Sequence, residues 1–398
     1  MDSRFCESAL SLATRARASA GFDSGLPPTL AGGTLGLAVM AASCEKADPG
    51  GGWGEAGHRW LVQSARAMSA DAVVPAALFS GLAGLGMVAM ELGGERSGYS
   101  RLLANVDDAL AAATSSFEDR CRDAAYLGLD ADVISGAAGI LRYWLARAPL
   151  QVADDNSRRL LAAMVEVARR NGGVLDIRFP SPYLDEQGRP EVRSGASCLG
   201  MAHGTPGALA AAALALLHGI DVPDLAWTVN STTDWLIDRS RLASDAMVWP
   251  MWSHSDGVED PNGNRTKDTW CYGNLGVSRA LAIAAAALGR DDIALVAAQA
   301  LSSACLRLRA DWQSLGWGLC HGKASVVAVL ARGFDGTRQP IVGETLTDLA
   351  SDLAARVEQD GAPTEIGSPS LLEGAAGVSL ALLSAGGFPE WDRVLLLS

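Results

Sequence analysis

The chain has 398 residues, a formal net charge of −13 and 49% hydrophobic residues, although aromatic residues make up only 6%. That length is enough for a sizeable buried core in one large or two ordinary domains. Because alanine, leucine and valine carry the hydrophobic content, the composition favours closely packed helices. The acidic charge, with no basic patch in the sequence, argues against nucleic acid as a partner.

Cysteine usage and the N-terminus together indicate a cytoplasmic protein. Seven cysteines are an odd number, and they lack the spacing of a small disulfide scaffold, which fits a reducing compartment. The first residues, Met1-Asp2-Ser3-Arg4, do not form the basic and apolar regions of a signal peptide. The longest apolar runs, such as Ala208–Leu217, are too short to span a membrane.

A pair of glycines three residues apart recurs along the chain, each time just before an apolar run. The pairs are Gly33/Gly36, Gly81/Gly84, Gly136/Gly139, Gly204/Gly207, Gly273/Gly276, the degenerate Gly322/Ser325, and Gly374/Gly377. Successive first glycines lie 48 to 69 residues apart, which leaves room for two helices per repeat.

The apolar runs after these glycines have almost no polar face, so they are predicted to form buried helices. Amphipathic segments alternate with them, for example the stripe Val342, Leu346, Leu349, Leu353 and Val357. Seven buried and seven half-exposed helices predict an all-α fold, an (α/α) toroid that forms one domain over residues 1–398. Two Pro- and Gly-containing loops, 171–199 and 248–268, are expected at the active-site rim.

Three residues of neighbouring repeats form a candidate metal site. Cys271 and Cys320 each stand two residues before the first glycine of repeats five and six, and His321 follows Cys320. Adjacent repeats of a closed ring would bring them together, and three protein ligands are what a catalytic zinc uses. The alternative is that both cysteines are ordinary buried residues. The matched positions and the adjacent histidine favour the metal.

Further polar residues occupy the same rim. His203 and Tyr272 directly precede the first glycines of repeats four and five, and Asp132 lies four residues before Gly136. Glu373 has the equivalent position in repeat seven, where it either binds substrate or caps its helix. The remaining histidines and cysteines are interpreted as structural or solvated: His58, His218, His254, Cys6, Cys44, Cys121, Cys198 and Cys305.

Several motifs together resemble those of the lanthipeptide cyclases, the lanthionine synthetase C-like family, in its stand-alone form. They are Trp270-Cys271-Tyr272-Gly273, Cys320-His321-Gly322, Ala202-His203-Gly204-Thr205-Pro206-Gly207 and Leu372-Glu373-Gly374, within a glycine frame that covers the whole chain. The resemblance implies zinc bound by Cys271, Cys320 and His321, with His203, Tyr272 and Asp132 as active-site residues. One departure is Lys267, where the family often has arginine. A lysine keeps the charge for substrate binding but loses the planar fork.

The resemblance also implies a reaction. Cysteine thiolates of a ribosomally made peptide would add, in a zinc-dependent Michael-type step, to dehydroalanine or dehydrobutyrine and form (methyl)lanthionine rings. His203 is the candidate proton donor, with Asp132 orienting it and Tyr272 as a second hydrogen-bond donor. The expected substrate is a dehydrated precursor peptide of antibiotic biosynthesis, and a dehydratase and a transporter are candidate partners in a biosynthetic complex.

Three alternatives stay open at the level of sequence. A protein of the same fold and zinc site could bind a thiol such as glutathione, or act as a scaffold, without cyclase activity. A prenyltransferase β-subunit is also a zinc-containing toroid, but it uses a different pattern of Asp, Cys and His. A toroidal glycosidase needs a carboxylate pair and would leave Cys271 and Cys320 without a role.

Overall fold

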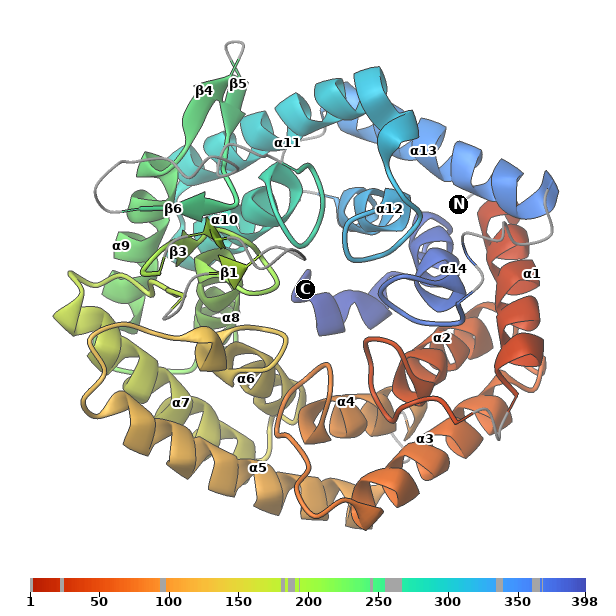
Figure 1. Cartoon of the computed structure of the whole chain (residues 1–398), viewed down its shortest axis with the longest axis horizontal. Helices are drawn as coiled ribbons and strands as arrows, with labels where there is room; N and C mark the ends of the chain where they lie inside the picture. Colours follow the sequence, from red (N-terminus) through yellow and green to blue (C-terminus); the bar gives the residue numbers. More distant parts are fainter. Residues whose placement is uncertain are drawn as a thin grey trace. The chain divides into compact units, whose positions relative to one another are not determined.

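Helices dominate the computed structural model, which describes residues 3–21, 25–93, 98–179, 183–184, 190–192, 194–243, 246–254, 267–333, 339–359, 366 and 368–398. The α-helices of this part of the chain (Figure 1) are α1 (Ser3–Ala20), α2 (Thr34–Ala47), α3 (Trp53–Ala70), α4 (Leu82–Gly93), α5 (Ser100–Cys121), α6 (Ala137–Ala146), α7 (Gln151–Arg170), α8 (Thr205–Leu217), α9 (Leu225–Asp238), α10 (Asn274–Leu288), α11 (Asp291–Asp311), α12 (Lys323–Arg332), α13 (Pro340–Gln359) and α14 (Ala375–Ala385). Short 3₁₀ helices are η1 (Leu129–Ala131), η2 (Trp312–Ser314) and η4 (Glu390–Leu395).

The contacts divide the chain into two compact units. Unit 1 comprises Met1–Ala109 and Cys305–Ser398, and unit 2 comprises Leu110–Ala304. Each unit has its own two layers of helices, as expected when every repeat supplies one fully apolar and one amphipathic helix.

In unit 1 the apolar helices α4, α2, α14 and α12 pack against one another in that order. The amphipathic helices α3, α1 and α13 pack against them from one side (Figure 1). The burial pattern explains the layering: α2 is buried continuously from Thr34 to Cys44, whereas α3 buries one stripe that includes Trp53, Trp60 and Met68. A helix without a polar face needs neighbours on every side, and an amphipathic helix needs them on only one.

Unit 2 repeats this arrangement. Helices α6, α8 and α10 pack in a row, and α7 and α9 cover them. Helix α8 is buried from Thr205 to Ala215, whereas α7 buries a stripe of residues such as Leu160, Leu161 and Met164. The predicted alternation of buried and half-exposed helices is therefore confirmed in both units.

The glycine pairs mark places where the backbone crosses itself closely. At first glycines such as Gly33, Gly81 and Gly374, an added Cβ would lie within 2.1 Å of the carbonyl oxygen six residues earlier. Second glycines follow the same rule: a Cβ on Gly276 would lie 2.2 Å from the Trp270 oxygen. Gly273 also has a φ of +83°, which residues with side chains rarely adopt. The motif therefore folds each loop back over the start of its helix.

The described residues of unit 2 also form three short antiparallel sheets. They pair β1 (Tyr183–Leu184) with β2 (Pro190–Val192), β3 (Ser197–Cys198) with β6 (Trp252–Ser253), and β4 (Arg241–Ala243) with β5 (Ala246–Val248). The β3–β6 pair joins the two predicted loops 171–199 and 248–268, with Cys198 opposite Trp252. Much of both loops lies outside the described residues, so their position at an active-site rim stays a prediction.

In the described part of the chain, one stretch, Asp291–Ser314, has the length and hydropathy of a membrane span. It consists of α11 and η2, and 44% of its most apolar window is buried within the protein. Helices that pack in the core of a globular protein meet the same criteria, so this stretch is weak evidence for a membrane span.

Candidate active site

Cys271 lies in a tight loop that ends at the start of α10. The Thr269 hydroxyl is 3.6 Å from the Cys271 sulfur, and it also donates a hydrogen bond to the Tyr272 carbonyl at 3.3 Å. The backbone N–H of Gly276 donates to the Thr269 carbonyl at 3.2 Å. Because the loop is fastened at both ends, the Cys271 thiol, which is 3% exposed, is held in a defined position.

Tyr272 stands at the edge of an aromatic cluster. Its ring meets Trp252 edge-on, with 5.4 Å between centroids, and Trp252 meets Phe179 in the same manner at 4.8 Å. Gly200 lies beneath the ring, because a Cβ there would come within 2.6 Å of a ring carbon. The cluster therefore fixes the plane of the half-buried Tyr272 ring.

His203 and Asp132 form a hydrogen-bonded pair, although 71 residues separate them in sequence. The His203 Nδ1 lies 2.5 Å from Asp132 Oδ2. The other carboxylate oxygen accepts hydrogen bonds from the backbone N–H groups of Ser135 at 2.7 Å and Gly136 at 3.0 Å. Asp132 is fully buried, whereas the His203 side chain is 40% exposed. A buried, oriented carboxylate thus holds an accessible imidazole and leaves its Nε2 for other partners.

Cys198 belongs to this neighbourhood, although the sequence indicated only a packing role. Burial raises the pKa of its thiol to about 12, opposed by hydrogen bonds from the Gly200 backbone and the Tyr272 side chain, while the nearby Asp132 and Cys271 raise it further. A sequence signal exists, because Cys198 lies six residues before Gly204, as Lys267 lies six before Gly273. The residue thus links the His203 and Cys271 loops of unit 2.

Unit 1 contributes Cys320 and His321 from the turn before α12. The N–H groups of Leu319 and Cys320 both donate to the Leu372 carbonyl, at 2.6 and 3.0 Å. The two neighbouring residues lie in a turn rather than a regular helix, as their joint use as ligands requires. Cys320 is half-buried and the His321 side chain is 49% exposed.

Glu373 contacts this turn. Its Oε1 lies 3.5 Å from His321 Nδ1, and its carboxylate packs against Gly318, where a Cβ would lie 2.4 Å from Oε2. A carboxylate at Nδ1 directs the opposite ring nitrogen, Nε2, towards a ligand or metal. This contact suits a Glu373 that orients His321. The role predicted from sequence, either substrate binding or helix capping, stays a prediction.

Lys267 stands at the start of the loop that leads to Cys271. Lys267 is exposed, and its backbone carbonyl lies against Gly273. A Cβ on Gly273 would lie 1.2 Å from that carbonyl oxygen. The substrate-binding role of Lys267 therefore stays a prediction.

Among the residues that the structure describes, Cys271, Cys320 and His321 are the group that could hold a metal ion. Two thiols and one imidazole are a donor set that suits zinc, and three protein ligands leave a position for water or substrate. The residues present therefore fit the metal that the sequence predicted.

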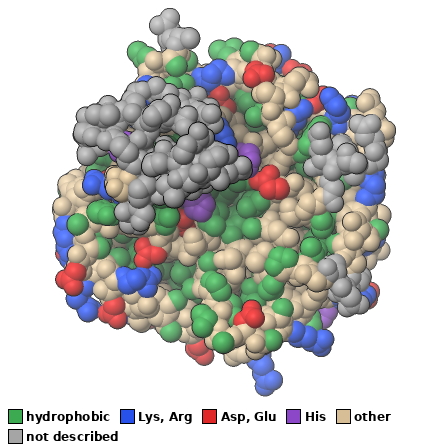
Figure 2. Space-filling model, viewed as in Figure 1, with side chains coloured by type: hydrophobic (Ala, Val, Ile, Leu, Met, Phe, Trp, Pro, Cys, Tyr) green, Lys and Arg blue, Asp and Glu red, His purple; other side chains and the backbone are tan. Residues whose placement is uncertain are grey.

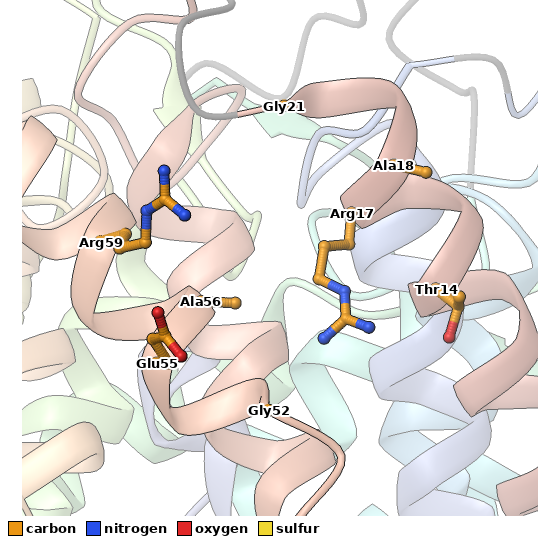
Figure 3. A pocket seen from close by; sticks show the side chains of 8 residues that line it. All are labelled: Thr14, Arg17, Ala18, Gly21, Gly52, Glu55, Ala56 and Arg59. Carbon is orange, nitrogen blue, oxygen red and sulfur yellow. The ribbon is translucent and has the colours of Figure 1, made fainter.

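A surface cavity in the described part of unit 1 is lined by none of these predicted residues. It has a volume of about 490 Å³ between α1 and α3, and Arg17 and Arg59 face it from the two helices (Figure 3). The Arg17 guanidinium is already engaged by the Trp53 ring at 4.2 Å and the Gly51 carbonyl at 3.1 Å. On the face seen in Figure 2, basic side chains are scattered, with acidic ones among them.

Comparisons with known proteins identify the family and the fold of the chain. A family model described as lanthionine synthetase C-like protein matches residues 24–396. The nisin biosynthesis protein NisC of Lactococcus lactis subsp. lactis is 23% identical over 309 residues, covering 76% of this chain and 72% of that protein. A solved structure of nisin cyclase superposes with a TM-score of 0.78 at 18% identity, covering 98% of this chain and 96% of that one.

The structural match shows the fold class, because the two chains correspond over almost their whole lengths. The predicted all-α class, an (α/α) toroid, is thereby confirmed. The family predicted from the cysteine, histidine and glycine motifs is confirmed as well. The chain belongs to the lanthionine synthetase C-like family and is an enzyme of the lanthionine synthetase, or cyclase, type.

Proposed function

We propose that the protein forms lanthionine and methyllanthionine rings by a zinc-dependent, Michael-type addition of peptide cysteine thiols to dehydroalanine or dehydrobutyrine. The single observation that carries the proposal is the donor set of Cys271, Cys320 and His321 within a chain of this family. A bound zinc ion would supply one thing, a lower pKa for a substrate thiol, so that its sulfur is an effective nucleophile at neutral pH.

The chain's own residues supply the proton chemistry. Addition of sulfur to the β-carbon of the dehydro residue leaves an enolate, which has to gain a proton at its α-carbon. We assign that proton transfer to His203, whose Nδ1 is held by Asp132 and whose ring is accessible. Until it is protonated, the enolate can expel the sulfur again, so this step commits the ring.

Tyr272 is assigned to the oxygen of the same enolate. Its phenol hydrogen-bonds Cys198 in this structure, and it can turn its single O–H to the developing negative charge, as donors do that stabilise an oxyanion. The contacts with Trp252 and Gly200 support that role because they hold the ring in one plane. Lys267 and Glu373 are assigned to substrate binding, and Glu373 also orients His321.

The proposal includes the setting of the reaction. The substrate would be a dehydrated precursor peptide in the cytoplasm, with a dehydratase and a transporter as partners in a biosynthetic complex. The related NisC is named as a nisin biosynthesis protein. We propose an analogous place for this chain, after the dehydration of serine and threonine residues. The long loops 171–199 and 248–268 are proposed to border the peptide site of a single catalytic domain.

A direct test uses a synthetic peptide with one dehydroalanine and one cysteine a few residues apart. Ring closure leaves the mass unchanged but removes the free thiol, so alkylation followed by mass spectrometry counts the open peptides. We expect closure well above the rate without enzyme. Zinc-loaded protein that binds the peptide thiol without closing any ring would favour a thiol-binding or scaffold function.

A further inference from the structure

A buried lysine directly follows the loop that carries Cys320 and His321. Lys323 is the first residue of α12, and it is only 2% exposed. Lysine is almost never buried so completely unless a partner compensates its charge. The burial of Lys323 therefore implies that neighbouring side chains compensate its charge.

Three side chains surround the Lys323 ammonium group. Its Nζ lies 3.5 Å from Asp352 Oδ2 on α13, and 5.0 and 4.6 Å from the ring centroids of Trp312 and Trp317. The Trp312 indole N–H donates to the same Asp352 oxygen at 2.9 Å. Both rings are within the range of favourable cation–π contact. We call Lys323, Asp352, Trp312 and Trp317 the lysine cluster.

The lysine cluster contacts residues 313–319, the chain segment that leads to the proposed metal ligands. Trp312 lies before this segment and Trp317 lies within it. The Lys323 N–H donates to the Gly316 carbonyl at 2.8 Å, and the next N–H along the helix, that of Ala324, donates to the Trp317 carbonyl at 3.2 Å. The loop is thus fastened to α12 and α13 on one side, and to the Leu372 carbonyl on the other.

At corresponding positions in other repeats, a side-chain hydrogen bond makes a simpler connection between neighbouring helices. Asn274 follows Cys271 by three residues, as Lys323 follows Cys320, and its side-chain amide donates to the Ala300 carbonyl of α11 at 3.1 Å. Thr34 begins α2, and its hydroxyl lies 2.6 Å from the Ser64 hydroxyl of α3. In each case the first residue of an apolar helix is tied to the helix that follows it.

We propose that Lys323 is a positioning residue for the metal site, and that the lysine cluster holds the Cys320–His321 turn in the conformation that lets both side chains bind one ion. The inference rests on the proposed metal site. Neighbouring residues ordinarily point in different directions, so their joint use as ligands depends on a fixed turn. Groups that orient metal ligands without touching the metal typically raise the metal affinity about 10- to 100-fold.

The experiment measures zinc affinity by competition with a chromophoric chelator, and records the absorption spectrum of the Co²⁺ form. The main variant is K323M/D352N, which removes both charges together, because leaving one buried charge unpaired would itself destabilise the fold. A milder second variant, Trp312→Phe, keeps an aromatic ring but removes the N–H that holds Asp352. Thr34→Val is the matched control, because it breaks the equivalent tie in a repeat that has no proposed ligand.

We expect K323M/D352N to keep a cooperative urea-unfolding transition but to bind zinc about 10- to 100-fold more weakly, with altered cobalt d–d bands. Trp312→Phe should show a smaller loss, and Thr34→Val should match the wild type. Wild-type affinity and cobalt spectra in both cluster variants would overturn the positioning role, as would an equal loss in Thr34→Val. Wild-type protein that binds no zinc would instead overturn the proposed function itself.

Discussion

The pair of His203 and Asp132 shows how a single side chain is prepared for proton transfer. Asp132 is fully buried, and its second oxygen is occupied by two backbone N–H groups, so the carboxylate has one orientation. That orientation fixes the imidazole, whose exposed part can reach a substrate. The sequence predicted that Asp132 orients His203, but not which atoms of the two side chains meet, because no local pattern reports the geometry of a contact across 71 residues.

His203→Asn tests this arrangement. The amide N–H can still donate a hydrogen bond to the Asp132 carboxylate, but the side chain cannot deliver a proton to the enolate, so ring closure should slow by about 10²- to 10⁴-fold. The zinc content should not change. The thiol-alkylation assay gives the rate, and His58→Asn serves as a control on the amphipathic helix α3. Closure at the wild-type rate would transfer the proton-donor role to Tyr272 or to water.

The buried thiol of Cys44 carries a prediction about pH. Burial, the largest cause, raises its pKa from an ordinary value of 9.0 to about 12, against the opposing effect of Arg17. The folded state therefore keeps the proton longer than the unfolded state. Its contribution to stability is complete below pH 9 and is lost as the pH rises towards 12.

Urea unfolding at several pH values between 8 and 10.5 measures this contribution. Above pH 9, Cys44 should lower the free energy of unfolding by up to about 1.4 kcal/mol for each pH unit. Cys44→Ala should be less stable at pH 8 but should show a slope that is shallower by about that amount. Parallel slopes in the two proteins would argue against a raised pKa in the folded state.

At the level of helices, the glycine pairs decide where each loop folds back over its helix. This part of the fold could be predicted from sequence, since the crowding involves a carbonyl only six residues away and the apolar run follows at once. The charge of a side chain does not by itself predict whether that side chain is exposed. A lysine at the start of α12 would be expected in solvent, yet Lys323 is buried because Asp352, Trp312 and Trp317 come together around it.

Gly276→Ala tests the account of the glycine pairs. The new Cβ would lie 2.2 Å from the Trp270 carbonyl oxygen and 2.9 Å from the Met201 Cβ, so the loop or the helix has to move. Overpacking of this kind costs about 1–3 kcal/mol of unfolding free energy. Gly343→Ala is the matched control, because nothing lies within 4 Å of its Cβ position and alanine favours the helix. Equal stability of the two variants would contradict the explanation.

For the whole molecule, the sequence predicted the family and the fold class because its motifs repeat at matched positions along the entire chain. It also predicted the group of two cysteines and a histidine that could hold a metal ion. The supporting contacts could not be predicted. Glu373 beside His321 and Cys198 beside Tyr272 depend on how separate loops pack, which no single repeat encodes.

The most direct test of the central claim is the zinc content of the purified protein and of its cysteine variants. Elemental analysis should give one equivalent of zinc per chain in the wild type. Cys271→Ala and Cys320→Ala should each lose most of it, and circular dichroism should show them still folded, because each unit has its own hydrophobic core. Cys305→Ala, on α11, is the control and should keep its zinc. Full zinc occupancy in either Cys271→Ala or Cys320→Ala would contradict the account.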